Sequence, residues 1–360
     1  MDLMGTCLAL FVLVCDVIYT DGWTLQDPNA FTRTIRMPHV RAQKADDLLC
    51  HAVKLNKRTA YIVKYEPHAS RTRAHHLMVY GCKVPGSTRP FWSCGETSDR
   101  SERSVCLDGE RQVVFAWALD APSMNLPEGV GFRVGGDTGI DYIVIQLHYV
   151  LRFPGYLTDD SGVTLHMTYT PQQKQAGFYV LADTGYIPPQ MQEFHMESAC
   201  DYDSYSIFPI GYRTHSHNLG MVTSGYRIRD GQWTEIGRMS PQLPQTFYNI
   251  TTPHISIRRG DILAARCTMN SMQREDYTMI GATNSDEMCN FYILYYTYRK
   301  ENLKVQYCFR DAQHFKWADY LETIPDSASS LAGIPHSDEI RDSFRPRLPR
   351  MRGRRHHATM

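Results

Sequence analysis

The chain has 360 residues, of which 42% are apolar, and its 38 basic residues balance its 38 acidic ones. This length allows about two domains with ordinary hydrophobic cores. Because the formal net charge is zero, electrostatics gives no reason to expect nucleic acid as a partner.

The N-terminus has the pattern of a secretion signal. Residues 7–14 form an unbroken apolar run, which is shorter than the roughly 20 residues of a membrane-spanning helix but typical of a signal peptide. We therefore predict a signal peptide over residues 1–20. No later run is apolar enough for a membrane anchor, so we expect a protein of the secretory-granule lumen or a secreted one.

Ten cysteines are present, and Cys7 and Cys15 fall in the predicted signal. The other eight form two groups of four, separated by a long gap. They are Cys50, Cys82, Cys94 and Cys106, then Cys200, Cys267, Cys289 and Cys308. An even number in a secreted chain predicts disulfides, and the gap predicts two separately cross-linked domains. A sequon at Asn249 also predicts an exposed, glycosylated loop.

Strand-like runs rich in Val, Ile, Tyr and Thr recur along the chain. They cover residues 60–65, 113–119, 142–150, 163–169, 221–229, 262–267 and 291–298. Asp230-Gly231 lies between two such runs and predicts a tight hairpin. Since no long helical period is present, we predict an all-β fold of two antiparallel β-sandwich domains, over residues 31–170 and 171–325.

The segment after these domains changes composition. Residues 326–360 are rich in Ser, Pro and Arg, and residues 341–360 contain seven arginines and one acid. This composition predicts a disordered basic tail.

The stretch Tyr212-Arg213-Thr214-His215-Ser216-His217 is the strongest candidate site. In a strand, alternate side chains share a face, so Arg213, His215 and His217 would lie on one side. Two imidazoles can chelate a transition metal, and the guanidinium beside them can hold a carboxylate. A solvated strand edge is the alternative interpretation of the same pattern.

Two further histidine positions give weaker signals. His75 and His76 are adjacent, so a regular strand would point them to opposite faces unless the backbone twists or bulges there. Gln146 and His148 share a face of an apolar strand, where a single histidine is more often a buried core residue than a ligand.

The segment from Asp286 to Tyr292 is a further candidate. If it is extended, Met288, Asn290 and Tyr292 share one face. The thioether of Met288 is a soft ligand suited to Cu(I), although a methionine is commonly core filler.

Taken together, these sites resemble the copper type II, ascorbate-dependent monooxygenases, and within them the peptidylglycine α-hydroxylating branch. The likeness extends over residues 31–325. It is densest in three stretches: His215 to Gly220, Ser224-Gly225-Tyr226-Arg227 through Ser240-Pro241-Gln242-Leu243-Pro244-Gln245, and Gly260-Asp261-Ile262-Leu263-Ala264-Ala265-Arg266-Cys267. Two further stretches are also similar, Ser285-Asp286-Glu287-Met288-Cys289-Asn290 and Gly131-Phe132-Arg133-Val134-Gly135-Gly136.

The resemblance implies two jelly-roll domains that face each other across a solvent cleft, with one copper ion in each. It implies an electron-transfer copper held by His75, His76 and His148. It implies a catalytic copper held by His215, His217 and Met288, with Tyr292 close to the chemistry. It further implies that Arg213, Asn290 and Tyr292 hold the carboxylate of the substrate, with Gln146 near the path between the domains.

The resemblance also supplies a disulfide pairing: Cys50–Cys94, Cys82–Cys106, Cys200–Cys308 and Cys267–Cys289. The implied activity is monofunctional hydroxylation of the α-carbon of a C-terminal glycine, the first step of peptide amidation, with O2 as co-substrate and ascorbate as reductant. Glycine-extended peptides would be the substrates, and a separate peptidyl-hydroxyglycine lyase would act next.

Two alternatives stay open from the sequence. One is a dopamine- or tyramine-β-hydroxylase-like copper monooxygenase, and the other is a non-catalytic secreted copper-binding protein. Leu77 and Ser216 depart from the family pattern beside the histidine pairs, but neither change removes a ligand.

Overall fold

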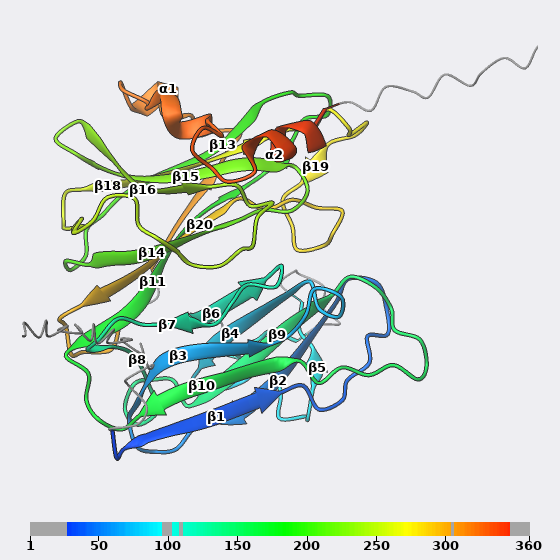
Figure 1. Cartoon of the computed structure of the whole chain (residues 1–360), viewed down its shortest axis with the longest axis vertical. Coiled ribbons are helices and arrows are strands. Elements are labelled where there is room, and N and C mark those ends of the chain that lie inside the picture. The colour runs from blue at the N-terminus through cyan, green and yellow to red at the C-terminus, as the bar shows by residue number, and fades with distance from the viewer. Residues whose placement is uncertain (1–26, 96–102, 108–110, 304–305, 346–360) are drawn as a thin grey trace, which may run out of the picture.

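The structure is a computed structural model that describes residues 27–95, 103–107, 111–303 and 306–345. The predicted signal peptide and residues 346–360 of the predicted tail lie outside these ranges. Two β-sandwich domains are stacked one above the other in Figure 1. Within the described residues, no helix has the length and apolar character needed to cross a membrane.

The first domain contains two sheets. One sheet has the order β1 (Ala30–Arg36), β10 (Gly162–Thr168), β3 (Ala60–His68), β8 (Val130–Val134), with β7 (Met124–Asn125) also paired to β3. The other has the order β5 (Trp92–Ser93), β2 (Asp47–Lys54), β9 (Tyr142–Tyr149), β4 (His76–Cys82), β6 (Gln112–Ala118). Large buried side chains such as Trp117, Phe115 and Tyr65 contribute to the core of this domain.

The second domain repeats this plan. One sheet contains β21 (Gln306–Asp311), β11 (Lys174–Thr184), β20 (Asn290–Thr297), β14 (Phe208–His215) and β17 (Tyr248–Asn249). The other contains β13 (Phe194–Asp201), β18 (Ile262–Met269), β15 (Gly220–Arg229) and β16 (Gln232–Met239). A short pair, β12 (Tyr186–Ile187) with β19 (Thr278–Met279), lies outside both.

The two domains are joined by backbone pairing as well as by the linker. Lys174 and Gln175 at the start of β11 pair in parallel with Val130 and Gly131 of β8. One sheet therefore runs from the first domain into the second, at the side of the molecule where β8 and β11 meet (Figure 1). The sequence did not predict this junction. The pairing of β11 with β21 is also parallel, and the other paired strands are antiparallel as predicted.

The predicted strands and hairpin are confirmed. Each predicted run overlaps a strand, and β15 and β16 pair around Asp230-Gly231. Both turn residues have positive φ, 51° for Asp230 and 75° for Gly231. This left-handed geometry is the one that a two-residue Asp-Gly turn favours between twisted strands.

The four predicted disulfides are all present: Cys50–Cys94, Cys82–Cys106, Cys200–Cys308 and Cys267–Cys289. Each pairs cysteines of the same domain. Cys200–Cys308 joins β13 of one sheet to β21 of the other, so it clamps the second sandwich. Each bridge is expected to stabilise the fold by about 2–4 kcal/mol, mainly by restricting the unfolded chain. Asn249 is exposed on the edge strand β17.

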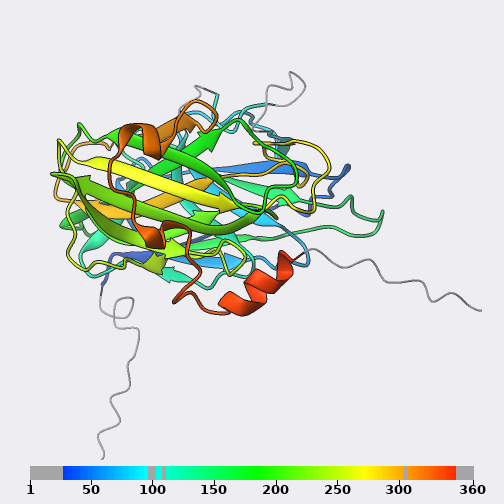
Figure 2. The same ribbon diagram turned by 90° about the horizontal axis from the view of Figure 1, so that it is seen from above.

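The prediction of a disordered tail is wrong for residues 326–345. This part contains η1 (Asp326–Ser329) and α2 (Ser337–Ser343), preceded by the short helix α1 (Trp317–Tyr320). Leu331, Ile334, Ile340 and Phe344 are buried and cluster with Val222 of β15. Figure 2 shows the segment crossing the outer face of the second domain. The average composition of this segment is polar, so its few, widely spaced apolar residues gave no signal in the sequence. They become buried only because they pack against the surface of β15.

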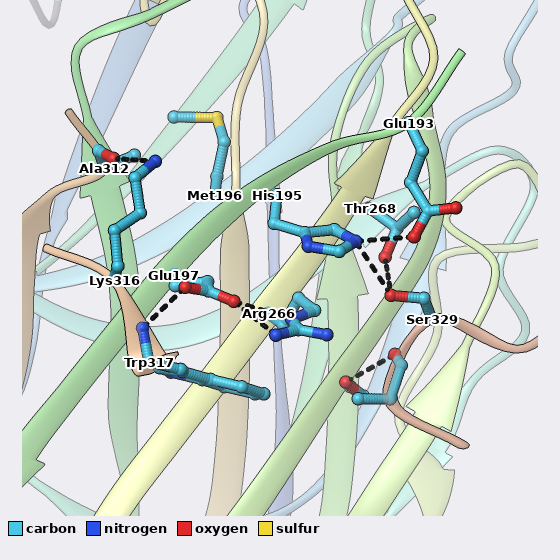
Figure 3. A network of polar contacts seen from close by, with 12 residues as sticks. Glu193, His195, Met196, Glu197, Arg266, Thr268, Ala312, Lys316, Trp317 and Ser329 are labelled. Carbon is cyan, nitrogen blue, oxygen red and sulfur yellow. Dashed lines mark hydrogen bonds and ion pairs between the residues drawn. The ribbon is translucent and has the colours of Figure 1, made fainter. Parts of the chain in front are cut away.

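A buried ion pair anchors the chain at α1, just before this segment. Glu197 of β13 accepts hydrogen bonds from the Arg266 side chain at 2.8 Å and from the Trp317 backbone N–H at 2.7 Å (Figure 3). The Arg266 guanidinium also lies 4.6 Å from the centre of a Trp317 ring. Further along, Ser329 bonds His195 at 3.1 Å. Together these contacts fix the C-terminal segment on the outer sheet.

We predict that Ile340→Ala lowers the free energy of unfolding by about 2 kcal/mol, at the low end for large-to-small substitutions, because α2 is a small satellite of the core. Chemical denaturation should show a lower midpoint with an unchanged slope. The control Arg341→Ala changes an exposed side chain of the same helix and should have little effect. Equal stability of Ile340→Ala and the wild type would contradict docking of this segment.

Candidate metal centres

Three histidines of the first domain converge because β4 and β9 pair with His76 opposite His148. His75 lies just before β4 in a bend, and its backbone N–H donates to the carbonyl of His148 at 2.8 Å. The strict alternation of strand faces therefore does not apply to His75. One ring nitrogen from each residue lies within 4.8 Å of the others.

The chemistry of this cluster fits a metal ion. The Nδ1 atoms of His75 and His76 are buried and have no hydrogen-bond partner, whereas His148 uses Nε2 to donate to Asp46 Oδ1 at 2.9 Å. Burial, reinforced by His148, lowers the pKa of His75 to about 4 and the pKa of His76 well below its ordinary value. Neutral imidazoles with unsatisfied nitrogens are the form that coordinates a metal.

In the second domain, β14 ends at His215, and His217 follows two residues later. His215 Nδ1–H donates to Gln245 Oε1 at 2.5 Å. That oxygen must be the acceptor, because Gln245 Nε2 already donates to the carbonyls of Ser216 and Pro241. This hydrogen bond fixes the tautomer of His215 and leaves Nε2 facing Met288 Sδ, 3.3 Å away.

His217 and Met288 are held by the loop that precedes β20. His217 Nδ1 donates to the carbonyl of Asp286 at 3.0 Å, and its Nε2 is buried without a hydrogen-bond partner. The Glu287 carboxylate accepts the backbone N–H groups of His217, Leu219 and Met288. Burial nevertheless raises the pKa of Glu287. Two imidazole nitrogens and a thioether therefore converge as a second donor set.

Burial also keeps His215 neutral. It lowers the pKa of His215 well below its ordinary value, and the neighbouring Arg213 charge lowers it further. A neutral ring with its proton fixed on Nδ1 can offer Nε2 to a metal.

Arg213 lies beside this second donor set. Its register partner in β20 is Tyr292, and that of His215 is Asn290. The Arg213 side chain is buried, with Nε bonded to the carbonyl of Gln245 at 2.8 Å and Nη1 left without a hydrogen-bond partner. Burial lowers the pKa of Arg213, but a guanidinium stays charged in proteins. In the part of the chain that the structure describes, no carboxylate pairs with it.

Both donor sets open into one cavity of about 360 Å³ between the domains. Its lining includes Arg213, His215, Met288, Asn290 and Tyr292 from the second domain and Leu48, His76, Met78 and Tyr80 from the first. The ring centres of His75 and His217 lie 6.0 Å apart, and those of His76 and His215 lie 6.1 Å apart. The predicted cleft is therefore narrow where the two sets face each other.

Gln146 does not join this constellation. It is fully buried, its amide donates to the carbonyl of Cys94 at 2.8 Å, and it does not line the cavity. Its two-residue spacing from His148 and its register opposite Met78 place it on the same strand face, where its amide is bonded to Cys94 instead. The sequence pattern did not predict roles for Gln245, Glu287 and Asp46. Glu287 directly precedes Met288 in the sequence, and only folding brings Gln245 and Asp46 to the histidines.

The fold and the site define a protein of two β-sandwich domains with one candidate three-donor metal centre in each. Residues 33–151 match the N-terminal domain, and residues 174–320 the C-terminal domain, of the copper type II ascorbate-dependent monooxygenases. The chain belongs to the copper type II ascorbate-dependent monooxygenase family.

Individual relatives agree with this assignment. The chain is 41% identical to the peptidyl-glycine alpha-amidating monooxygenase of Mus musculus over 307 residues, which cover 84% of this chain and 30% of that protein. It is 43% identical to peptidyl-glycine alpha-amidating monooxygenase A of Xenopus laevis over 74% of this chain and 28% of that protein. It is 28% identical to the dopamine beta-hydroxylase of Canis lupus familiaris over 69% of this chain and 42% of that protein. The chain thus spans less than half the length of these relatives.

We predict that the protein binds two copper ions and that the two sites can be removed separately. The variants His76→Ala and His215→Ala should each bind one copper ion, because each variant loses a ligand of one set only. Equilibrium dialysis followed by metal analysis measures the stoichiometry. Exposed His314 lies outside both sets, so His314→Ala should still bind two. Loss of both ions from either single variant would contradict two separate centres.

Proposed function

We propose that the chain is a peptidylglycine α-hydroxylating monooxygenase, which hydroxylates the α-carbon of a C-terminal glycine in a peptide. The observation that carries this proposal is Arg213. Its guanidinium is buried at the cavity, has one nitrogen without a hydrogen-bond partner, and faces no carboxylate among the described residues. A buried, uncompensated positive charge calls for an anionic ligand, and a C-terminal carboxylate fits its planar fork.

The strand register gives the substrate a direction. Arg213 precedes His215 by two residues on the same face of β14, with Tyr292 and Asn290 opposite them on β20. A carboxylate on Arg213 therefore puts the glycine α-carbon, the next atom along the peptide, towards His215 and Met288. The amide of Asn290 and the phenol of Tyr292, 3.4 Å apart, lie where they can bond the same carboxylate.

His75, His76 and His148 would hold one copper ion, and His215, His217 and Met288 the other. Copper bound there supplies the one-electron chemistry with O2, and ascorbate is the reductant. Gln245 and the carbonyl of Asp286 keep the second-domain rings in the tautomer that presents Nε2. The surrounding apolar lining, including Leu48 and Met78, limits the water beside the reacting carbon. Holding the glycine there supplies orientation.

The product would be a peptidyl-α-hydroxyglycine, so a peptidyl-hydroxyglycine lyase would act on it next to complete amidation. The four disulfides support a secretory-pathway location, because such bridges persist in oxidising compartments. Glycine-extended peptides in the secretory granule are the substrates that this location and Arg213 together favour.

We predict that Arg213→Gln lowers kcat/KM at least 30-fold for a peptide with a free C-terminal glycine. This corresponds to a loss of about 2–5 kcal/mol in transition-state binding, because the ion pair is desolvated. Copper content should not change, since arginine is not a ligand. A peptide ending in an amide should be a poor substrate of the wild type, and the variant should affect it little. Steady-state kinetics with both peptides gives the comparison.

Arg111 provides a matched control. It lines the same cavity from the first domain, with its guanidinium 5.4 Å from the Tyr80 ring. Arg111→Gln should therefore affect free-acid and amidated peptides alike. Equal losses for the two peptides in Arg213→Gln would reject the carboxylate clamp. A preference for amines without a carboxylate would favour a dopamine-β-hydroxylase-like activity, and absence of turnover in the copper-loaded wild type would favour a copper-binding protein.

We predict that Met288→Ile abolishes hydroxylation while the fold and the first-domain centre are retained. Isoleucine is close to methionine in volume, so packing changes little, but the soft sulfur ligand is lost. X-ray absorption of the Cu(I) protein should show that the sulfur contribution disappears, and thermal unfolding should be near that of the wild type. Exposed Met279 of β19 gives the control Met279→Ile, which should keep both activity and the sulfur signal. Near-normal turnover of Met288→Ile would mean that Met288 only fills space.

A further inference from the structure

One carboxylate touches both domains at the metal centres. Asp46 lies in the loop between β1 and β2, and its Oδ1 accepts a hydrogen bond from His148 Nε2 at 2.9 Å. The same oxygen accepts the backbone N–H of Asn284, in the second domain, at 3.2 Å. The Asp46 backbone has a left-handed φ of 52°, and its N–H is tied to the carbonyl of Val150 at 3.2 Å. An aspartate tolerates this conformation better than most residues.

Asn284 belongs to the loop that holds the second donor set. Asp286 closes this loop by accepting the N–H and hydroxyl of Thr283 at 3.1 and 2.7 Å. The carbonyl of Asp286 orients His217, and Met288 follows two residues later. Asp46 therefore connects a histidine of the first centre to the loop that places His217 and Met288 of the second.

The other polar contacts between the domains do not touch a ligand. Arg133 lies on β8, in the sheet that joins the domains. It donates to the carbonyl of Lys300 at 3.1 Å and to Asn302 Oδ1 at 3.0 Å. Tyr307 donates to the carbonyl of Arg111 at 3.3 Å, and both residues line the cavity. Among the described residues, Asp46 is thus distinct in bonding both a metal-ligand side chain and the opposite domain.

We propose that Asp46 is a positioning residue that couples the first metal centre to the docking of the second domain. It orients His148 with Nδ1 as the ligand atom, and the same oxygen holds the loop of residues 283–288 against the first domain. This inference rests on the two metal centres and does not depend on the peptide substrate.

The coupling follows from charge. A metal on His148 polarises its Nε2–H and strengthens the bond to Asp46, as carboxylate partners of metal-bound histidines do. A firmly placed Asp46 then holds Asn284 more tightly, so that copper in the first centre favours the docked arrangement. By linkage, docking favours copper in the first centre to the same extent.

The test uses the full chain in a His215→Ala background, in which only the first donor set is complete. Asp46→Asn keeps the shape and an acceptor but removes the charge. We expect Cu(II) affinity at the first centre to fall about 10–100-fold, with an altered electron paramagnetic resonance spectrum. Amide hydrogen exchange at Asn284 should slow on copper addition with Asp46 present, and this response should be lost in Asp46→Asn.

Asp120→Asn is the matched control, because Asp120 also accepts a backbone N–H, that of Arg71 at 2.9 Å, but within one domain. It should keep the copper affinity, the spectrum and the exchange response. Unchanged copper affinity, or unchanged exchange at Asn284, in Asp46→Asn would overturn the proposal. A lower melting temperature as the only effect would also overturn it. If Asp46→Asn does not fold, the His215→Ala protein alone decides the question. If amide exchange at Asn284 does not slow when copper is added to that protein, the coupling is rejected.

Discussion

Buried nitrogen atoms without hydrogen-bond partners are the constraint on which the rest of the structure depends. Nδ1 of His75 and His76 and Nε2 of His217 are in this state. Each buried, unsatisfied polar group costs about 1–3 kcal/mol, so a fold gains nothing from gathering them unless a ligand satisfies them. Desolvation also holds His75 and His76 in the neutral form, which gives copper donors that need not lose a proton first.

The surrounding β structure serves to hold those donors at fixed angles. Pairing of β4 with β9 sets His76 against His148, and pairing of β14 with β20 sets Arg213 against Tyr292. Hydrogen bonds donated by His215 to Gln245 and by His217 to the Asp286 carbonyl then fix which ring nitrogen is left to hold a metal. Sheets are suitable for this task because their registers are specified by the buried faces and so are difficult to shift.

The relation between the domains is maintained by apolar packing, backbone pairing and polar bridges, and Phe178 of the second domain packs into the core of the first beside Phe132. The β8–β11 pair joins the sheets at one place, and Asp46 and Tyr307 bridge the domains near the cavity. The distance between the two donor sets is therefore a property of domain docking, whereas the geometry inside each set is a property of its own sandwich.

The sequence by itself determined the elements whose signals are local. Period-two alternation placed Arg213, His215, Asn290 and Tyr292 on one side, and Asp230-Gly231 fixed the hairpin. The disulfide pairing and the gathering of His75, His76 and His148 came from the likeness to a family, because spacing alone left them open. Only the tertiary structure decided the junction of β8 with β11, the ordered path of residues 326–345, the buried place of Gln146 and the roles of Gln245 and Asp46. Each of these depends on contacts between residues far apart in the chain, and such contacts leave no periodic trace in the sequence.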